Sequence, residues 1–263
     1  MSIRPTKLLG LGAAALLMLV AVPAAGQSPA APPIPKVTVP FPQDDGTLTP
    51  YTFELGYSLV TLIYDTLMWR DEKGIPQPWL AEKVDVSADG TSITATLPEN
   101  VAWQDGKPLT AADVVFTFRW ITDHEHPRFT QQLRALREVR QESPRTVVFS
   151  LSRPSPGFLD QPLADVPIVP RHLWEGLPPG RVAPEGLPVG SGPYRLVRYL
   201  PDEGYRFDAN LSYFRGVPSV GAIEVPILND ADKTLGAFER GRVDMLPINR
   251  PAAAVERLES LST

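Results

Sequence analysis

Hydrophobic residues recur with two different periods in the first half of the chain. Between Glu54 and Arg70 they are spaced three and four residues apart, as on one face of a helix, at Leu55, Leu59, Leu62, Ile63 and Leu67. This spacing predicts an amphipathic helix over residues 54–70. Further along, apolar and polar residues alternate on both sides of the turn Ala88-Asp89-Gly90, with Val84 and Val86 before it and Ile93, Ala95 and Leu97 after it. A period of two around such a turn predicts a β-hairpin with one buried face.

The remaining elements are marked by caps, turns and short runs of β-branched residues. The sequence from Thr110 to Asp113 is a variant of the capping box and predicts a helix that runs to about Trp120. A second helix is expected over 230–240, with Gly241 in the cap position that follows it, and a third over 251–261. Strands are expected at 36–41, 146–151, 194–199, 205–209, 222–228 and 243–246. This mixed order predicts an α/β (mixed α+β) fold without internal repeats.

The first 26 residues have the pattern of a secretory signal peptide. Arg4 and Lys7 precede 15 residues, Leu8 to Val22, that are apolar or Gly, and small residues follow up to Gly26. A permanent anchor is the alternative, but 15 residues fall short of the ~20 that span a bilayer. We therefore expect cleavage near Gly26 and a mature protein in the periplasm. The next nine residues, 27–35, are rich in Pro and Ala and are predicted to form a disordered linker.

Composition excludes several classes of function. The chain has no cysteine, which removes disulfides, thiol catalysis and cysteine-ligated metals. Loss of Arg4 and Lys7 leaves 23 basic against 30 acidic side chains, a net charge of −7, and the charges are interspersed. Nucleic-acid binding is therefore not expected. The 30 prolines, about twice the usual ~5%, favour short elements joined by rigid turns.

Two motifs suggest chemistry without specifying it. Gly190-Ser191-Gly192 lacks the outer glycine of a nucleophile elbow and the Lys of a phosphate loop, so we interpret it as a turn that enters a strand. The run Asp123-His124-Glu125-His126 is dense in side chains that can bind metal. Its histidines are two residues apart and not four, which fits the helical pair of zinc hydrolases poorly, and a solvated loop is the simpler interpretation.

Aromatic residues are the better candidates for binding. Tyr51 lies beside Pro50 in a turn, where the periodicity places it on no core face. Trp120 and Phe129 flank the irregular segment after the capped helix. We predict that these three side chains contact a ligand, although most aromatic rings in a domain of this size belong to its core.

The order of motifs resembles a known family, the bacterial extracellular solute-binding proteins, family 5, which serve dipeptide, oligopeptide and nickel ABC importers. The matching segments, which together extend from about Lys36 to Met245, include PQDDGTLTPYTFE, YDTLMWRDEKGIPQPWLAEKV, WQDGKPLTAADVVFTF, PIVPRHLW, LPVGSGPYRLVRY and NLSYFRGVPSVGAIEVPILNDADKTLGAFERGRVDM. Each is weak alone, and their common order makes the resemblance strong.

The resemblance implies the type II fold of periplasmic binding proteins, a clamshell of two lobes. Such a protein acts as a monomer, closes on a small polar, peptide-like solute and delivers it to permease subunits. It needs no cofactor or metal and carries out no covalent chemistry. It places residues 36–61 and 167–250 in the first lobe, 62–166 in an extra domain found in this family, and 251–263 at the start of the connection to a second lobe. Family members are nearly twice as long, so the sequence is expected to be an N-terminal fragment.

Two alternatives remain open at this point. The first is a secreted metal-dependent hydrolase that uses His124 and His126. The second is a remnant that still docks the permease but binds no solute. For the hydrolase, both histidines must lie near a third ligand, whereas a binding protein does not need them.

Overall fold

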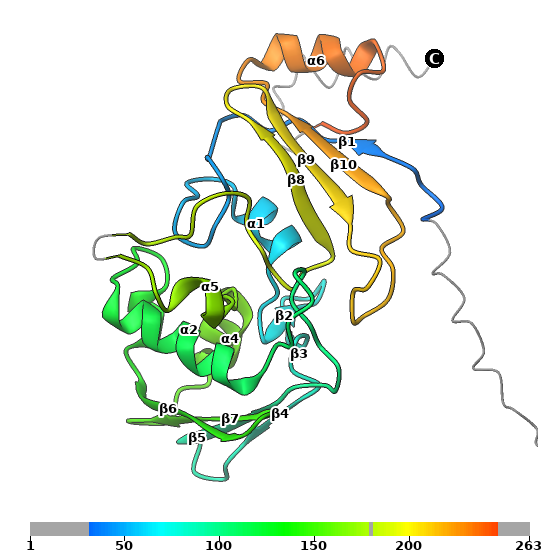
Figure 1. The fold of residues 1–263 in the computed structure, drawn as a ribbon. Helices are drawn as coiled ribbons and strands as arrows, with labels where there is room; N and C mark the ends of the chain where they lie inside the picture. The colour runs from blue at the N-terminus through cyan, green and yellow to red at the C-terminus, as the bar shows by residue number, and fades with distance from the viewer. Residues whose placement is uncertain (1–31, 179–180, 247–263) are drawn as a thin grey trace, which may run out of the picture. The chain divides into compact units, whose positions relative to one another are not determined.

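Two four-stranded sheets with separate hydrophobic cores form the part of the chain that the structure, a computed structural model, describes: residues 32–178 and 181–246 (Figure 1). The first sheet has the order β1-β10-β9-β8. Its strands are β1 (Val37–Thr38), β8 (Tyr194–Leu200), β9 (Gly204–Ala209) and β10 (Ala222–Pro226). β1 pairs in parallel with β10, and the other pairs are antiparallel.

The second sheet is antiparallel throughout, in the order β4-β5-β7-β6. Its strands are β4 (Lys83–Val86), β5 (Ser92–Thr96), β6 (Leu136–Ser143) and β7 (Thr146–Leu151). The pairing of the predicted hairpin is confirmed, and Ile93 and Ala95 of β5 are buried. The buried face does not include Val86 of β4, which is 48% exposed. Helix α2 (Ala111–Asp123) covers the apolar face of this sheet and contributes Val114 and Phe118 to the same core.

The capping box at the start of α2 is confirmed. Asp113 reaches back and accepts a hydrogen bond from the backbone N–H of Thr110 at 2.9 Å. The helix extends to Asp123, three residues beyond the predicted end. It contacts the second sheet, the short helix α5 (Arg171–Trp174) and the 3₁₀ turn at 130–133.

The long helix predicted over 54–70 is wrong in extent: only α1 (Tyr57–Ile63) is helical. At its start the Asp45 carboxylate accepts the backbone N–H groups of residues 54, 55 and 56, which hold that stretch in a turn. At its end Tyr64 is extended, and strand β2 (Met68–Arg70) pairs with β3 (Pro76–Pro78). Leu67 is buried beside this hairpin. Its apolar side chain fits the three- and four-residue spacing of the helix, although Leu67 lies outside the helix.

The last part of the described chain agrees with prediction except at one strand. Helix α6 (Ala231–Glu239) begins at the N-cap Asp230, which accepts the N–H of Lys233, and Gly241 follows in the left-handed region with φ +65°. Residues 243–246 form no strand: among the described residues this stretch makes a single backbone hydrogen bond, from Asp244 N–H to the Thr38 carbonyl. The helix predicted over 251–261 lies outside the described residues.

Ordered structure begins earlier than the predicted linker boundary. Ile34, within the segment 27–35, forms a parallel bridge with Val220, and its carbonyl accepts the N–H of Gly221 at 2.7 Å. The signal sequence itself lies outside the described residues. No helix in the described ranges has the length and apolar character needed to cross a membrane.

Each of the two four-stranded sheets has its own hydrophobic core. The members of one core lie between Leu67 and Ile168 and pack α2 against the second sheet. This core is adjoined by the short helices α3 (Gly157–Asp160) and α4 (Pro162–Asp165) and by the 3₁₀ turn η1 (Thr130–Leu133). The other packs α1, α5 and Trp120 against the first sheet. Trp120 therefore ties the α2 region to the core of the first sheet.

Candidate functional site

The three predicted binding residues lie in one group of aromatic rings, here called the aromatic cluster and formed by Tyr51, Phe53, Tyr57, Trp120, His124, His126, Phe129 and Trp174. The ring of Tyr51 lies 4.8 Å from that of His126 and 5.9 Å from that of Trp174. Trp120 is 5.9 Å from Trp174, and Phe129 is stacked on His126 at 4.3 Å. Residues 51–57 and 120–129, which are far apart in sequence, thus pack together, and Trp174 joins Tyr51 to Trp120.

The members of the cluster differ in what they can offer to a ligand. Tyr51, Phe53 and Tyr57 are half-buried, whereas Trp120 is 8% and Phe129 0% exposed. Phe129 could contact a ligand directly only if its neighbours moved. In this structure its ring supports the neighbouring rings of Phe53, Tyr57 and His126. The Tyr51 hydroxyl donates to the His124 carbonyl at 3.0 Å, which fixes the ring in place. Contact of these residues with a solute stays a prediction.

The histidines of the 123–126 run are used in packing. His126 is 7% exposed, and its Nδ1 accepts the backbone N–H groups of Arg128 and Phe129 at 3.0 and 3.2 Å. Burial lowers the pKa of His126 below 6.5, in spite of a hydrogen bond to the Pro50 carbonyl that raises it. His124 is stacked on Trp120 at 3.7 Å. Within residues 32–178 and 181–246, no group of three or more His, Cys, Asp or Glu could hold a metal ion, and the hydrolase alternative has no support.

Beside the aromatic cluster lies an ion pair that sequence reasoning missed. Arg128 binds Asp165 through two bonds, Nε to Oδ2 at 3.0 Å and Nη2 to Oδ1 at 2.6 Å. Gln132 donates to the same carboxylate at 2.7 Å, and the Tyr57 hydroxyl donates to the Asp165 carbonyl at 2.6 Å. Burial alone would raise the pKa of Asp165, but the bonds from Arg128 and Gln132 outweigh it and hold this pKa below 3.8. The partners are 37 positions apart, so no local pattern could reveal the pair.

A second buried carboxylate, Asp65, joins three segments behind α1. It accepts hydrogen bonds from Trp79 Nε1 at 2.9 Å, Ser191 Oγ at 2.8 Å and the Tyr213 hydroxyl at 2.7 Å. Burial raises the pKa of Asp65, although all three bonds act to lower it. This network gives Ser191 a structural role, in agreement with the interpretation of residues 190–192 as a turn.

The glycines of that turn are required by close backbone contact with the end of α1. Gly192 N–H donates to the Ile63 carbonyl at 2.7 Å. A Cβ at Gly190 would lie 1.9 Å from the same carbonyl oxygen. Only glycine fits at this distance.

The acidic pair before α1 is also structural. Asp44 accepts the hydroxyl protons of Tyr199 and Tyr205 at 2.8 and 3.1 Å, and Asp45 N–H donates to the Tyr205 hydroxyl at 2.8 Å. These bonds attach the turn that carries Tyr51 to the first sheet. Both tyrosines lie more than 150 positions away along the chain, so no local pattern could reveal these partners.

A groove of about 490 Å³ adjoins the aromatic cluster at Trp120. Its lining comes from α2, β6 and α5 and includes Phe116, Arg119, Arg140 and Arg171. Arg171 is paired with Glu175 at 2.6 Å, so the groove carries both signs of charge. Its volume would admit part of a small solute.

The sequence and the fold both match known proteins. The family model "Bacterial extracellular solute-binding proteins, family 5 Middle" matches residues 76–262. Protein XP55 of Streptomyces lividans is 34% identical over 194 residues, which cover 72% of this chain and 35% of that protein. A Brucella ovis protein named "Putative ABC transporter peptide-binding protein" is 27% identical over 205 residues. These residues cover 75% of this chain and 38% of that protein.

A solved structure gives the corresponding result for the fold. MoaA of A. tumefaciens R10, a periplasmic solute-binding protein in complex with mannopinic acid, matches with a TM-score of 0.73 and 28% identity, covering 88% of this chain and 48% of its own. The chain thus spans about a third of the length of the two curated relatives and about half of the solved one. The mixed α/β fold is that of type II periplasmic binding proteins, as the resemblance implied. The chain belongs to the bacterial extracellular solute-binding proteins, family 5.

Proposed function

We propose that this chain captures a small polar solute, peptide-like in character, for an ABC importer and delivers it to the permease subunits without chemical change. The observation that carries the proposal is the family match over residues 76–262. The relative from Brucella ovis supports a peptide-like solute, and the acid bound by MoaA supports a small polar one. Family members act outside the cytoplasmic membrane, and we propose that the signal sequence is removed near Gly26 to release a periplasmic protein.

The two cores support a division of the chain into parts with different roles. We assign residues 36–61 and 167–250 to the first lobe, because the first sheet and α1 share one core. We assign residues 62–166 to the extra domain, because most of the core around α2 and the second sheet comes from this range. Residues 251–263 would lead toward the second lobe. The aromatic cluster lies where both parts contribute side chains, which is a suitable place for a solute to be held.

Capture in this proposal depends on apolar contact and hydrogen bonding. The half-buried rings of Tyr51, Phe53 and Tyr57 would cover an apolar part of the solute, and polar side chains beside these rings would bind its polar part. No cofactor or metal is required, since nothing is transformed.

The test is a binding titration of the mature chain, from residue 27, with a mixture of tripeptides. NMR chemical shifts detect dissociation constants in the millimolar range, which corresponds to about −4 kcal/mol. We expect shifts at Tyr51, Phe53 and Tyr57, and at least a fivefold weaker affinity in Tyr51→Ala, about 1 kcal/mol for the loss of one ring. Trp69→Ala is the matched control, because Trp69 is 40% exposed and lies outside the aromatic cluster.

Two results would count against the proposal. If no peptide shifts any resonance of the aromatic cluster, the chain is the non-binding remnant. If Trp69→Ala and Tyr51→Ala weaken binding equally, the solute binds elsewhere. Amino-terminal sequencing of the exported protein tests the cleavage position separately.

A further inference from the structure

The guanidinium of Arg128 is held in one orientation beside the aromatic cluster. Asp165 binds it through two nitrogens, and its Cζ lies 4.1 Å from the centroid of the Tyr57 ring and 5.9 Å from that of Phe129. Asp165 is itself buried, with only 4% of its side chain exposed. A salt bridge with one buried partner and a stacked ring fixes an arginine far better than a solvated pair does.

This arginine keeps unused hydrogen-bond donors although it is fixed. A guanidinium has five N–H groups, and the bonds to Asp165 use one on Nε and one on Nη2. Among the described residues, no hydrogen bond is found for Nη1. Asp165 therefore occupies one edge of the planar group, and the opposite edge, formed by Nη1 and the second proton of Nη2, is free. The side chain is 43% exposed, unlike the buried carboxylate that it binds.

We propose that the free edge of Arg128 binds a carboxylate of the solute through two parallel hydrogen bonds. The inference rests on the proposed function and names the chemical class of solute: an acid whose carboxylate lies next to an apolar group that packs on Tyr51 and Phe53. Because Asp165 neutralises much of the positive charge, recognition depends on the geometry of the fork. A lysine, which is a point charge without that fork, cannot replace it.

The test compares two probes that differ only at the carboxylate: the tripeptide Ala-Phe-Ala with a free C-terminus and the same peptide with a C-terminal amide. The full mature chain is titrated with each, and the ratio of the two dissociation constants is measured by NMR. We expect the acid to bind at least about tenfold more tightly, the effect of one charge-assisted contact. Arg128→Lys and Arg128→Gln should reduce this ratio to about one.

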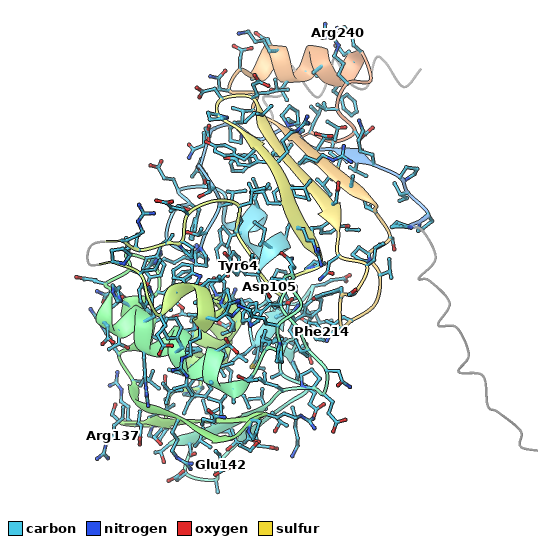
Figure 2. All side chains as sticks on the ribbon, viewed as in Figure 1. Tyr64, Asp105, Arg137, Glu142, Phe214 and Arg240 are labelled. Carbon is cyan, nitrogen blue, oxygen red and sulfur yellow. The ribbon has the colours of Figure 1, made fainter. Side chains whose placement is uncertain are left out.

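The matched control is Arg137→Gln, an exposed residue of β6 that Figure 2 shows well away from Tyr64. It should keep the wild-type ratio. Because Arg128→Gln leaves Asp165 buried without its partner, the double variant with Asp165→Asn removes both charges together. The ratio is measured on folded protein, and a purely structural role of Arg128 would leave it unchanged.

The outcomes separate this inference from the proposed function. If acid and amide bind equally to the wild-type chain, the inference is overturned and solute capture stands. If the acid is preferred but Arg128→Lys and Arg128→Gln keep the preference, another group binds the carboxylate and Arg128 does not. If neither peptide binds, the proposed function fails, and this inference fails with it.

Discussion

Removal of the Asp65 carboxylate should destabilise the protein more than the loss of any single surface charge. Asp65 is 3% exposed and accepts three hydrogen bonds, from Trp79, Ser191 and Tyr213. In Asp65→Ala these three donors lose their acceptor. Ser191 and Tyr213 are 1% and 9% exposed, so water cannot readily replace the lost carboxylate as their acceptor. Trp79 is half-buried, and its N–H can donate to water instead.

The expected loss in the free energy of unfolding follows from Ser191 and Tyr213, the two donors that stay buried. Each buried polar group left without a partner costs about 1–3 kcal/mol, which gives about 2–6 kcal/mol for Asp65→Ala. Such a loss is a large fraction of the 5–15 kcal/mol by which domains are usually stable. Asp65→Asn keeps one acceptor oxygen and avoids burying a charge, whose cost is visible in the raised pKa of Asp65. We expect about 1–3 kcal/mol for that variant.

Urea unfolding of the mature chain, followed by tryptophan fluorescence and circular dichroism, measures these differences. Asp85→Ala on β4 is the control: its ion pair with Lys83 is exposed, and its loss should change stability by less than about 1 kcal/mol. If Asp65→Ala unfolds within 1 kcal/mol of the wild-type chain at an unchanged m-value, the network does not hold the three segments together.

Three further predictions concern the turn at 190–192, the buried histidine and the helix cap. Gly190→Ala should cost about 3 kcal/mol, because its Cβ would meet the Ile63 carbonyl, while Gly176→Ala, with nothing within 4 Å, should leave the melting temperature nearly unchanged. Burial lowers the pKa of His126 below 6.5, so the stability that its neutral ring contributes should be fully present above pH 6.5 and fall as the pH drops below that value; a His126→Asn chain that keeps this slope would refute the assignment. Asp113→Ala removes the acceptor for two backbone N–H groups, those of Thr110 and Arg171, and should cost about 1–3 kcal/mol in thermal unfolding, with Asp113→Asn closer to wild type.

The candidate site was predictable in its aromatic part only. Tyr51 could be singled out because the periodicity assigned it to no core face, and Trp120 and Phe129 because a capped helix ends between them. The structure brings the three into one cluster, but it buries Phe129 completely. Arg128 was missed because its partner Asp165 comes near through tertiary folding. The sequence around both residues contains no motif that marks the pair.

Local signals in the sequence determined the elements that depend on neighbours in the chain. The capping box at Thr110, the hairpin around residues 88–90 and the glycine after α6 require only nearby backbone groups, and each forms where it was expected. The order of the motifs also identified the family. These features depend on interactions within a few residues, which a pattern can record.

Only the tertiary structure decided where elements stop and which polar groups meet. The helix expected over 54–70 is limited at one end by the distant carboxylate of Asp45 and at the other by the pairing of β2 with β3. Asp65 and Arg128 find partners far along the chain, at Tyr213 and Asp165. Burial at such contacts makes each unsatisfied donor or charge costly, and that cost is absent from any local stretch of sequence.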